Sequence, residues 1–238
     1  KKKINVKQKY SLNNLRTICS TGSPLSVSGF RYVYQNIKED VHLASISGGT
    51  DIISCFVLGN IYQPVIAGEI QGKGLGMDVD IFDEDGNSVK NEKGELVCKK
   101  PFPSMPLKFW NDKKDQKFKE AYFSKYENIW YHGDYVKLKN SGGFIIYGRS
   151  DATLNPGGVR LGTAEIYSEL EKFEEIKESL VIGQDWDNDI RIILFLVLNS
   201  DFHLNSKLMS DIKKRIRQNL SPRHVPAKII TVTDIPRT

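Results

Sequence analysis

The chain has 238 residues, of which 39% are hydrophobic and 26% are charged, and its formal net charge is +5. This composition is ordinary for a globular protein that buries a sizeable core in one large or two modest domains. The net charge favours polyanionic partners, but acidic and basic residues alternate along the chain, so we expect a mixed solvated surface and no nucleic-acid partner.

The first half of the sequence predicts short strands separated by turns. The apolar run in 15–26 predicts a strand that enters a Gly/Pro turn, and 29–37 predicts a short helix. The segment 41–52 predicts a strand that ends at paired glycines. Two hairpins follow, over 74–101 and 131–149, each with glycine at its turn. Such a succession of strands indicates a small sheet or a distorted barrel.

From Thr163 the apolar period changes to that of a helix, with Thr163 as its N-cap. A strand is predicted at 192–198, and a final strand at 227–235. The chain therefore reads as a β-rich part followed by a compact α/β unit, joined at 148–162. The apolar faces of the two predicted helices are Ile166, Leu170, Phe173 and Ile176, and Leu208, Ile212, Ile216 and Leu220.

Several classes of protein are excluded by short-range patterns. The basic opening "KKKINVKQKY" is not followed by an apolar stretch, so it is not a signal peptide, and the run Ile190–Leu198 is too short to span a bilayer. Because the first residue is not methionine, we expect a fragment. Scattered cysteines favour a reducing cytoplasm without disulfides or zinc. Neither the cysteines nor the histidines have metal-ligand spacing: Cys19, Cys55, Cys98, His42, His132, His203 and His224.

Few isolated motifs indicate chemistry. There is no G-x-S-x-G motif, and "GKGLG" at 72–76 lacks the ending of a phosphate-binding loop, so we interpret it as a turn. Asp134 follows a glycine in "YHGD", at an expected strand end. A carboxylate there can accept hydrogen bonds from a diol such as a ribose, although aspartate is also common in turns for purely structural reasons.

The segment "GRSDATLNPGGVRLGTAEIY", 148–167, concentrates two arginines, an aspartate and a glycine-rich turn before a predicted helix. Together with "STGSPLS", "SISGGTDI", "GELV", "YHGD" and "PRT", in that order, it resembles the adenylate-forming superfamily of acyl-CoA synthetases, luciferases and peptide-synthetase adenylation domains. Within that group the acetoacetyl-CoA synthetases are the most similar. The resemblance covers nearly the whole chain.

The resemblance implies a mixed α/β and α+β fold in two parts. Residues 1–150 would be the C-terminal portion of the large AMP-binding domain, with a sheet and a distorted β-barrel. Residues 151–238 would be most of a small, mobile α/β domain. The family's phosphate loop is expected before Lys1, and its catalytic lysine just after Thr238, so we expect the 238-residue chain to be nearly inactive alone.

The implied activity is that of an acid–thiol ligase. Acetoacetate would be joined to the α-phosphate of ATP with release of pyrophosphate, and the acyl group would then pass from AMP to CoA, with Mg²⁺ as the metal. The partners would thus be small molecules. Two alternatives stay open: a ligase for another short acid such as acetate or butyrate, and a non-catalytic nucleotide- or CoA-binding module. The sequence does not indicate an oligomeric state.

The resemblance also implies roles in the first part of the chain. Gly22, Ser23 and Pro24 would lie along the adenine. Thr50 would hydrogen-bond the phosphate, and Asp51 would hold Mg²⁺, as a hard carboxylate ligand can. The ribose would be bound by Asp134 and Arg149. Gly48 and Gly49 would leave volume for an acid longer than acetate, although paired glycines also suit a turn.

In the second part, the resemblance makes Asp151 the hinge of the mobile domain. Gly157 and Gly158 would lie along the thiol-bearing arm of CoA, where a side chain would obstruct it. Arg160 would bind a phosphate of the nucleotide or of CoA. Arg217 would contact the CoA phosphates, or would belong to a solvated helix face with Lys213, Lys214 and Arg215.

Overall fold

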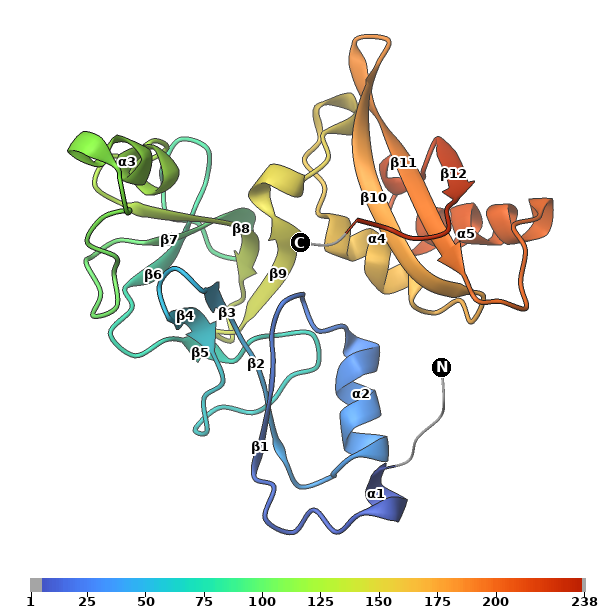
Figure 1. Ribbon diagram of the computed structural model, residues 1–238, viewed down its shortest axis with the longest axis horizontal. Coiled ribbons are helices and arrows are strands. Elements are labelled where there is room, and N and C mark those ends of the chain that lie inside the picture. The colour runs from blue at the N-terminus through green and yellow to red at the C-terminus, as the bar shows by residue number, and fades with distance from the viewer. Residues whose placement is uncertain (1–5, 237–238) are drawn as a thin grey trace. The chain divides into compact units, whose positions relative to one another are not determined.

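The computed structural model describes residues 6–236, and the chain divides into two compact units, Lys1–Ile146 and Tyr147–Thr238. Figure 1 shows the elements of both in chain order. The division falls slightly before residue 150, where the sequence placed the domain boundary. The functional identity of the two domains stays a prediction. Each unit has its own hydrophobic core.

The first unit begins with a parallel strand pair and a connecting helix. Parallel neighbours need such a crossover, and Ser26 begins the helix by accepting a hydrogen bond of 3.2 Å from the backbone N–H of Gly29. Phe30 and Leu43 are buried between helix and strands. The predicted strand and helix are both confirmed. The elements are α1 (Val6–Lys9), β1 (Thr17–Ser20), α2 (Val27–Asn36) and β2 (His42–Ser45).

Two antiparallel sheets complete the first unit. The strand predicted at 41–52 is in fact two strands, β2 and β3, and both predicted hairpins are confirmed. Helix α3 was not predicted; it packs Phe118 against Trp130 in the main core. The sheets are β3 (Ser47–Gly49), β4 (Ser54–Leu58) and β5 (Gly72–Lys73), and β6 (Val79–Phe82), β7 (Lys93–Cys98), β8 (Trp130–Leu138) and β9 (Phe144–Arg149); α3 is Gln116–Phe123.

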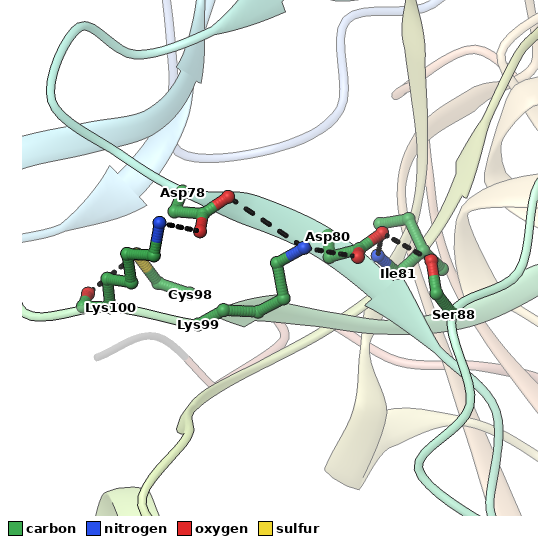
Figure 2. Close-up of polar contacts among 7 residues, drawn as sticks. All are labelled: Asp78, Asp80, Ile81, Ser88, Cys98, Lys99 and Lys100. Carbon is green, nitrogen blue, oxygen red and sulfur yellow. Dashed lines mark hydrogen bonds and ion pairs between the residues drawn. The ribbon is translucent and has the colours of Figure 1, made fainter.

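An ion-pair network holds the edge of the β6–β7 hairpin (Figure 2). Lys99 Nζ donates to Asp80 Oδ2 at 3.0 Å, while Ser88 and the Ile81 amide donate to Asp80 Oδ1 at 3.0 and 2.9 Å. Burial acts to raise the pKa of Asp80, but these hydrogen bonds outweigh it and the pKa lies below its ordinary value. We assign this network a structural role, since none of its residues is among the candidate site residues.

The second unit is a three-stranded sheet with two helices. The strand and helix predicted at 192–198 and around Leu208–Leu220 are confirmed, as is the last strand, but the long strand β10 was not predicted. Ile166, Leu194 and Ile212 lie in one core. The elements are α4 (Thr163–Leu170), β10 (Ile176–Trp186), β11 (Asp189–Leu198), α5 (Ser206–Asn219) and β12 (Lys228–Thr231), with strand order β10-β11-β12.

Two details of α4 correct the sequence interpretation. Its N-cap is Gly162, not Thr163, and the Gly162 N–H donates to the Glu165 carboxylate at 3.2 Å. Thr163 is buried in the first turn instead. The helix ends at Leu170, so Phe173 and Ile176 continue the apolar pattern outside it.

None of the helices between residues 6 and 236 has the length and apolarity to cross a membrane.

Candidate functional site

Thr50 and Asp51 lie in the turn between β3 and β4, and both are exposed. Tyr122 of α3 donates a hydrogen bond of 2.6 Å from its hydroxyl to Asp51 Oδ2. Its ring is stacked on the buried Trp130, with centroids 3.7 Å apart and an interplanar angle of 15°. Burial and the contact with Asp51 raise the pKa of Tyr122 above its ordinary value, so the phenol keeps its proton and acts as donor.

Asp134 lies within β8, so the prediction that it ends a strand was wrong. The β7–β8 register is irregular opposite it, and Gly133 has a φ of +80°, which indicates a bulge that redirects the side chain. Ser47 Oγ donates to Asp134 Oδ2 at 2.6 Å, and His132 Nε2 lies 3.5 Å from the same oxygen. The Asp134 side chain is 9% exposed, so its orientation is tightly set.

The β3–β4 turn and the β8 bulge thus meet around Gly49. A Cβ atom at Gly49 would collide with Asp51 Oδ1 and would lie 3.6 Å from His132 Cε1. Asp51 thus lies close to the backbone of Gly49, and Asp134 is connected to the same position through His132. Ser47, Tyr122 and His132 join this cluster, and the sequence interpretation did not assign them roles.

The glycines predicted to open a pocket differ from each other. A Cβ at Gly48 would collide with the carbonyl oxygen of Ser54 and lie 2.6 Å from Cys55 Cα. Both atoms belong to the paired strand, so the hairpin itself requires glycine there. At Gly49 the obstacle is the end of the Asp51 side chain. Only Gly49 therefore lies where the absence of a side chain affects the candidate site.

The chemistry of Asp51 suits a hard cation. The exposed Asp51 carboxylate and the hydroxyl of its sequence neighbour Thr50 are oxygen ligands, and Mg²⁺ is commonly held by one or two carboxylates together with phosphates and water. In the described part of the chain, no three His, Cys, Asp or Glu residues are grouped so that they could hold a metal ion. A cation at Asp51 would therefore need further ligands from a phosphate and water.

Gly22, Ser23 and Pro24 form an exposed bend directly after β1. Gly22 has a φ of +89°, which strongly favours glycine, and a Cβ there would meet no atom within 4 Å. An exposed backbone without side-chain obstruction permits a flat ring to approach closely. The structure leaves the assignment of these residues to adenine as a prediction.

In the second unit, Arg149 and Asp151 are exposed and their side chains approach to 3.6 Å. Arg160 is more constrained. Its Nε donates to Thr153 Oγ1 at 3.0 Å and its Nη2 donates to the Ser150 carbonyl at 3.1 Å. These bonds connect Arg160 to the start of the 150–161 loop, whose two ends are also paired by the bridge between Leu154 and Leu161. Arg160 therefore has a structural role in addition to the phosphate contact predicted for it.

Gly157 and Gly158 lie in an exposed turn with φ values of +60° and +73°. The Gly157 N–H donates to both carboxylate oxygens of Asp189, at 2.9 and 3.1 Å. The hydrogen bonds from Gly157 and from the Ile190 amide hold the pKa of Asp189 below its ordinary value. Arg217 is exposed in the last turn of α5. This position is compatible both with a contact to the CoA phosphates and with a solvated helix face.

Comparison with known proteins gives a consistent result, although no family model matches the chain. The acetoacetyl-coenzyme A synthetase of Rhizobium meliloti is 58% identical over 96% of this chain. Its counterpart in Xenopus tropicalis is 50% identical over 96% of the chain. This chain is homologous to the acetoacetyl-CoA synthetases. It spans about a third of their length, covering 35% of the R. meliloti protein and 34% of the X. tropicalis protein.

Comparison with solved structures leads to the same group of proteins. The acetoacetyl-CoA synthetase of Streptomyces lividans superposes with a TM-score of 0.89 and 42% identity, over 98% of this chain and 35% of that one. An anthranilate CoA ligase with bound anthranoyl-AMP gives a TM-score of 0.81 at 21% identity, over 97% of this chain and 43% of that one, which shows the shared fold. The mixed α/β fold thus matches part of the structures of acyl-CoA synthetases.

Proposed function

We propose that the full-length gene product containing this sequence is an acetoacetate–CoA ligase. The observation that carries the proposal is the 58% identity to the R. meliloti synthetase across 96% of the chain. The reaction has two steps. A carboxylate oxygen of acetoacetate attacks the α-phosphorus of ATP, and pyrophosphate leaves. The thiol of CoA then attacks the acyl carbon, AMP leaves with the bonding electron pair, and the thiol proton passes to water.

The first unit would serve the nucleotide, as the end of the large AMP-binding domain. The Gly22–Pro24 bend would lie along the adenine, and Asp134 would accept hydrogen bonds from the ribose. This role of Asp134 is supported by the bond from Ser47, because a carboxylate fixed before binding loses little orientational freedom on binding. Thr50 would donate to a phosphate oxygen. Mg²⁺ held through Asp51 would neutralise charge on the phosphates.

The second unit would serve the transfer to CoA, as most of the small mobile domain. Asp151 would be its hinge residue, and Arg149 would contribute to ribose binding. Gly157 and Gly158 would border the thiol-bearing arm, since their exposed backbone has space around it. Arg160 and Arg217 would contact phosphates. The protein would work in the cytoplasm, in agreement with Cys19, Cys55 and Cys98 all being free thiols.

The deciding measurement is acid-dependent ATP–pyrophosphate exchange by the purified full-length protein. Acetoacetate, acetate and butyrate are compared at equal concentration, without CoA. We expect exchange to be strongest with acetoacetate. Stronger exchange with another acid would replace the substrate but keep the reaction. No exchange with any acid, from protein that binds ATP in calorimetry, would replace the ligase with a nucleotide-binding module.

A further inference from the structure

The glycine turn of the second unit is attached to a distant hairpin by one side chain. Asp189 begins β11, and its carboxylate accepts the Gly157 N–H through both oxygens, at 2.9 and 3.1 Å. Its Oδ1 also accepts the Ile190 N–H at 2.7 Å. In Figure 1, the turn that precedes α4 lies beside the β10–β11 hairpin. A charged acceptor makes such bonds stronger than those between neutral groups.

The tip of the turn, at Gly157 and Gly158, has few other restraints on its conformation. Two consecutive glycines with positive φ have the largest conformational freedom of any residue pair. The hydrogen bonds within the turn are long: Gly158 N–H to the Asn155 carbonyl and Val159 N–H to the Pro156 carbonyl, both at 3.3 Å. A Cβ at Gly158 would have no atom within 4 Å. The Leu154–Leu161 bridge fixes the ends of the turn, but at its tip the bond from Gly157 to Asp189 is shorter than the bonds within the turn.

The β10–β11 hairpin that carries Asp189 is itself held by many contacts. Strands β10 and β11 pair continuously from Glu178–Val197 to Trp186–Asp189. At its end, the guanidinium of Arg191 lies 3.5 Å from the ring centroid of Trp186, and Arg191 Nε donates to Gln184 Oε1 at 2.8 Å. These contacts order the end of the hairpin although it is exposed.

We propose that Asp189 is a positioning residue for the thioester-forming step: it holds the Gly157–Gly158 backbone in the shape along which the thiol-bearing arm of CoA lies. The inference rests on the proposed function. It assigns Asp189 no contact with CoA and no part in proton transfer. Its effect falls on the second step, in which the bond from sulfur to the acyl carbon forms and the bond from that carbon to the AMP oxygen breaks.

The test uses the full-length protein and separates the two steps. Adenylation is measured by ATP–pyrophosphate exchange without CoA, and transfer by single-turnover reaction of enzyme-bound acyl-adenylate with CoA. For Asp189→Ala we expect transfer to be slower by about tenfold, with a higher CoA concentration for half-maximal rate, because small misplacements are costly in rate. Adenylation should stay within about twofold of wild type, as no adenylation residue is altered.

Two further variants make the result specific. Asp189→Asn keeps an acceptor oxygen, so transfer should recover part of the lost rate. Asp185→Ala removes an exposed acid from the same hairpin without touching Gly157, and both steps should match the wild type. Wild-type transfer by Asp189→Ala, or an equal loss in both steps, would overturn the positioning role. If the proposed function itself were wrong, the wild type would show no acid-dependent ATP–pyrophosphate exchange, which is a different result from either of these.

Discussion

Ser47 donates a hydrogen bond of 2.6 Å to Asp134 although the two residues are 87 positions apart in the sequence. The contact joins β3 to the bulge of β8, and it restrains a carboxylate whose side chain is 9% exposed. Sites that bind polar groups gain affinity from such restraint, because the acceptor is already oriented when the ligand arrives.

Replacing Ser47 should therefore weaken nucleotide binding in the full-length protein. For Ser47→Ala we expect the dissociation constant of ATP to rise by about threefold to tenfold, since a hydrogen bond to a charged group contributes about 1 kcal/mol or somewhat more. Isothermal titration calorimetry measures this directly. Ser54→Ala, in the neighbouring strand, is the matched control and should bind as the wild type does. An unchanged constant for Ser47→Ala would contradict the role given to Asp134.

Tyr122 offers a clean test of the Asp51 assignment, because phenylalanine keeps the ring stacked on Trp130 and removes only the hydroxyl. For Tyr122→Phe we expect the Mg²⁺ concentration for half-maximal exchange to rise by about threefold or more, with unfolding free energy lowered by only about 1 kcal/mol. Mn²⁺ binding to the ATP complex, followed by electron paramagnetic resonance, gives a readout independent of activity.

The control for this substitution is Tyr126→Phe. Tyr126 also donates a hydroxyl hydrogen bond, to the backbone carbonyl of Asp83 at 2.7 Å, so this variant loses a phenol hydrogen bond at a residue other than Asp51. Its cation dependence should not change. Equal shifts in the two variants would show that the effect is a general loss of stability.

The paired glycines should respond differently to alanine. Gly48→Ala places a methyl group against the β4 backbone, which cannot move without breaking the hairpin, so we expect a loss of about 2 kcal/mol or more in unfolding free energy. Gly49→Ala displaces only the Asp51 carboxylate; it should fold normally and alter cation dependence and acid preference. Thermal unfolding together with the exchange assay distinguishes the two. Normal folding of Gly48→Ala would remove the structural reason for that glycine.

The Asp80–Lys99 pair predicts a pH dependence with a definite sign. The folded pKa of Asp80 lies below 3.8, so its contribution is complete above pH 3.8 and disappears as the pH falls through the folded value. The pKa of Lys99 is raised above 10.5, mainly by the Asp80 hydrogen bond, so its contribution is complete below pH 10.5 and disappears as the pH rises through the folded value. Between these limits the contribution should be constant.

Urea unfolding of Asp80→Asn tests this. We expect a loss of about 1–2 kcal/mol relative to wild type from pH 5 to 9, because a nearly buried carboxylate and its partners lose their bonds. The difference should shrink below pH 3.8, down to the lowest pH at which the wild type stays folded. Lys100→Met is the control: that lysine is 77% exposed and contacts Asp78 at 3.5 Å, so its loss should be small. A difference that grows in acid would reverse the assigned sign.

Local periodicity predicted the elements that depend on local physics. The hairpins ending in β7 and β9 follow from alternation and glycine turns, and α5 follows from Leu208, Ile212 and Ile216 at helical spacing. The strand β10 was missed because its buried residues do not alternate cleanly. The N-cap of α4 was misassigned to Thr163. The cap is Gly162, and its backbone N–H donates to the Glu165 side chain.

The candidate site was predictable only where residues are consecutive or match a family motif. Thr50 and Asp51 adjoin in one turn, and Asp134 is connected to that turn through Ser47 and His132, while the roles of all three stay predictions. Tyr122 and Ser47 act across 71 and 87 positions, and no spacing rule connects residues so far apart. Asp189 lies 32 positions from Gly157, and contacts of that kind become visible only once β10 and β11 are paired.

That last contact sets the size of the piece that protein engineers can exchange between relatives. A chimera that transplants only the glycine turn would separate Gly157 from the carboxylate that shapes it, and the graft would lose its geometry in the new host. Carrying the hairpin end at 185–190 along with the turn keeps donor and acceptor from the same parent. A cassette that keeps this contact within one parent is therefore discontinuous in sequence.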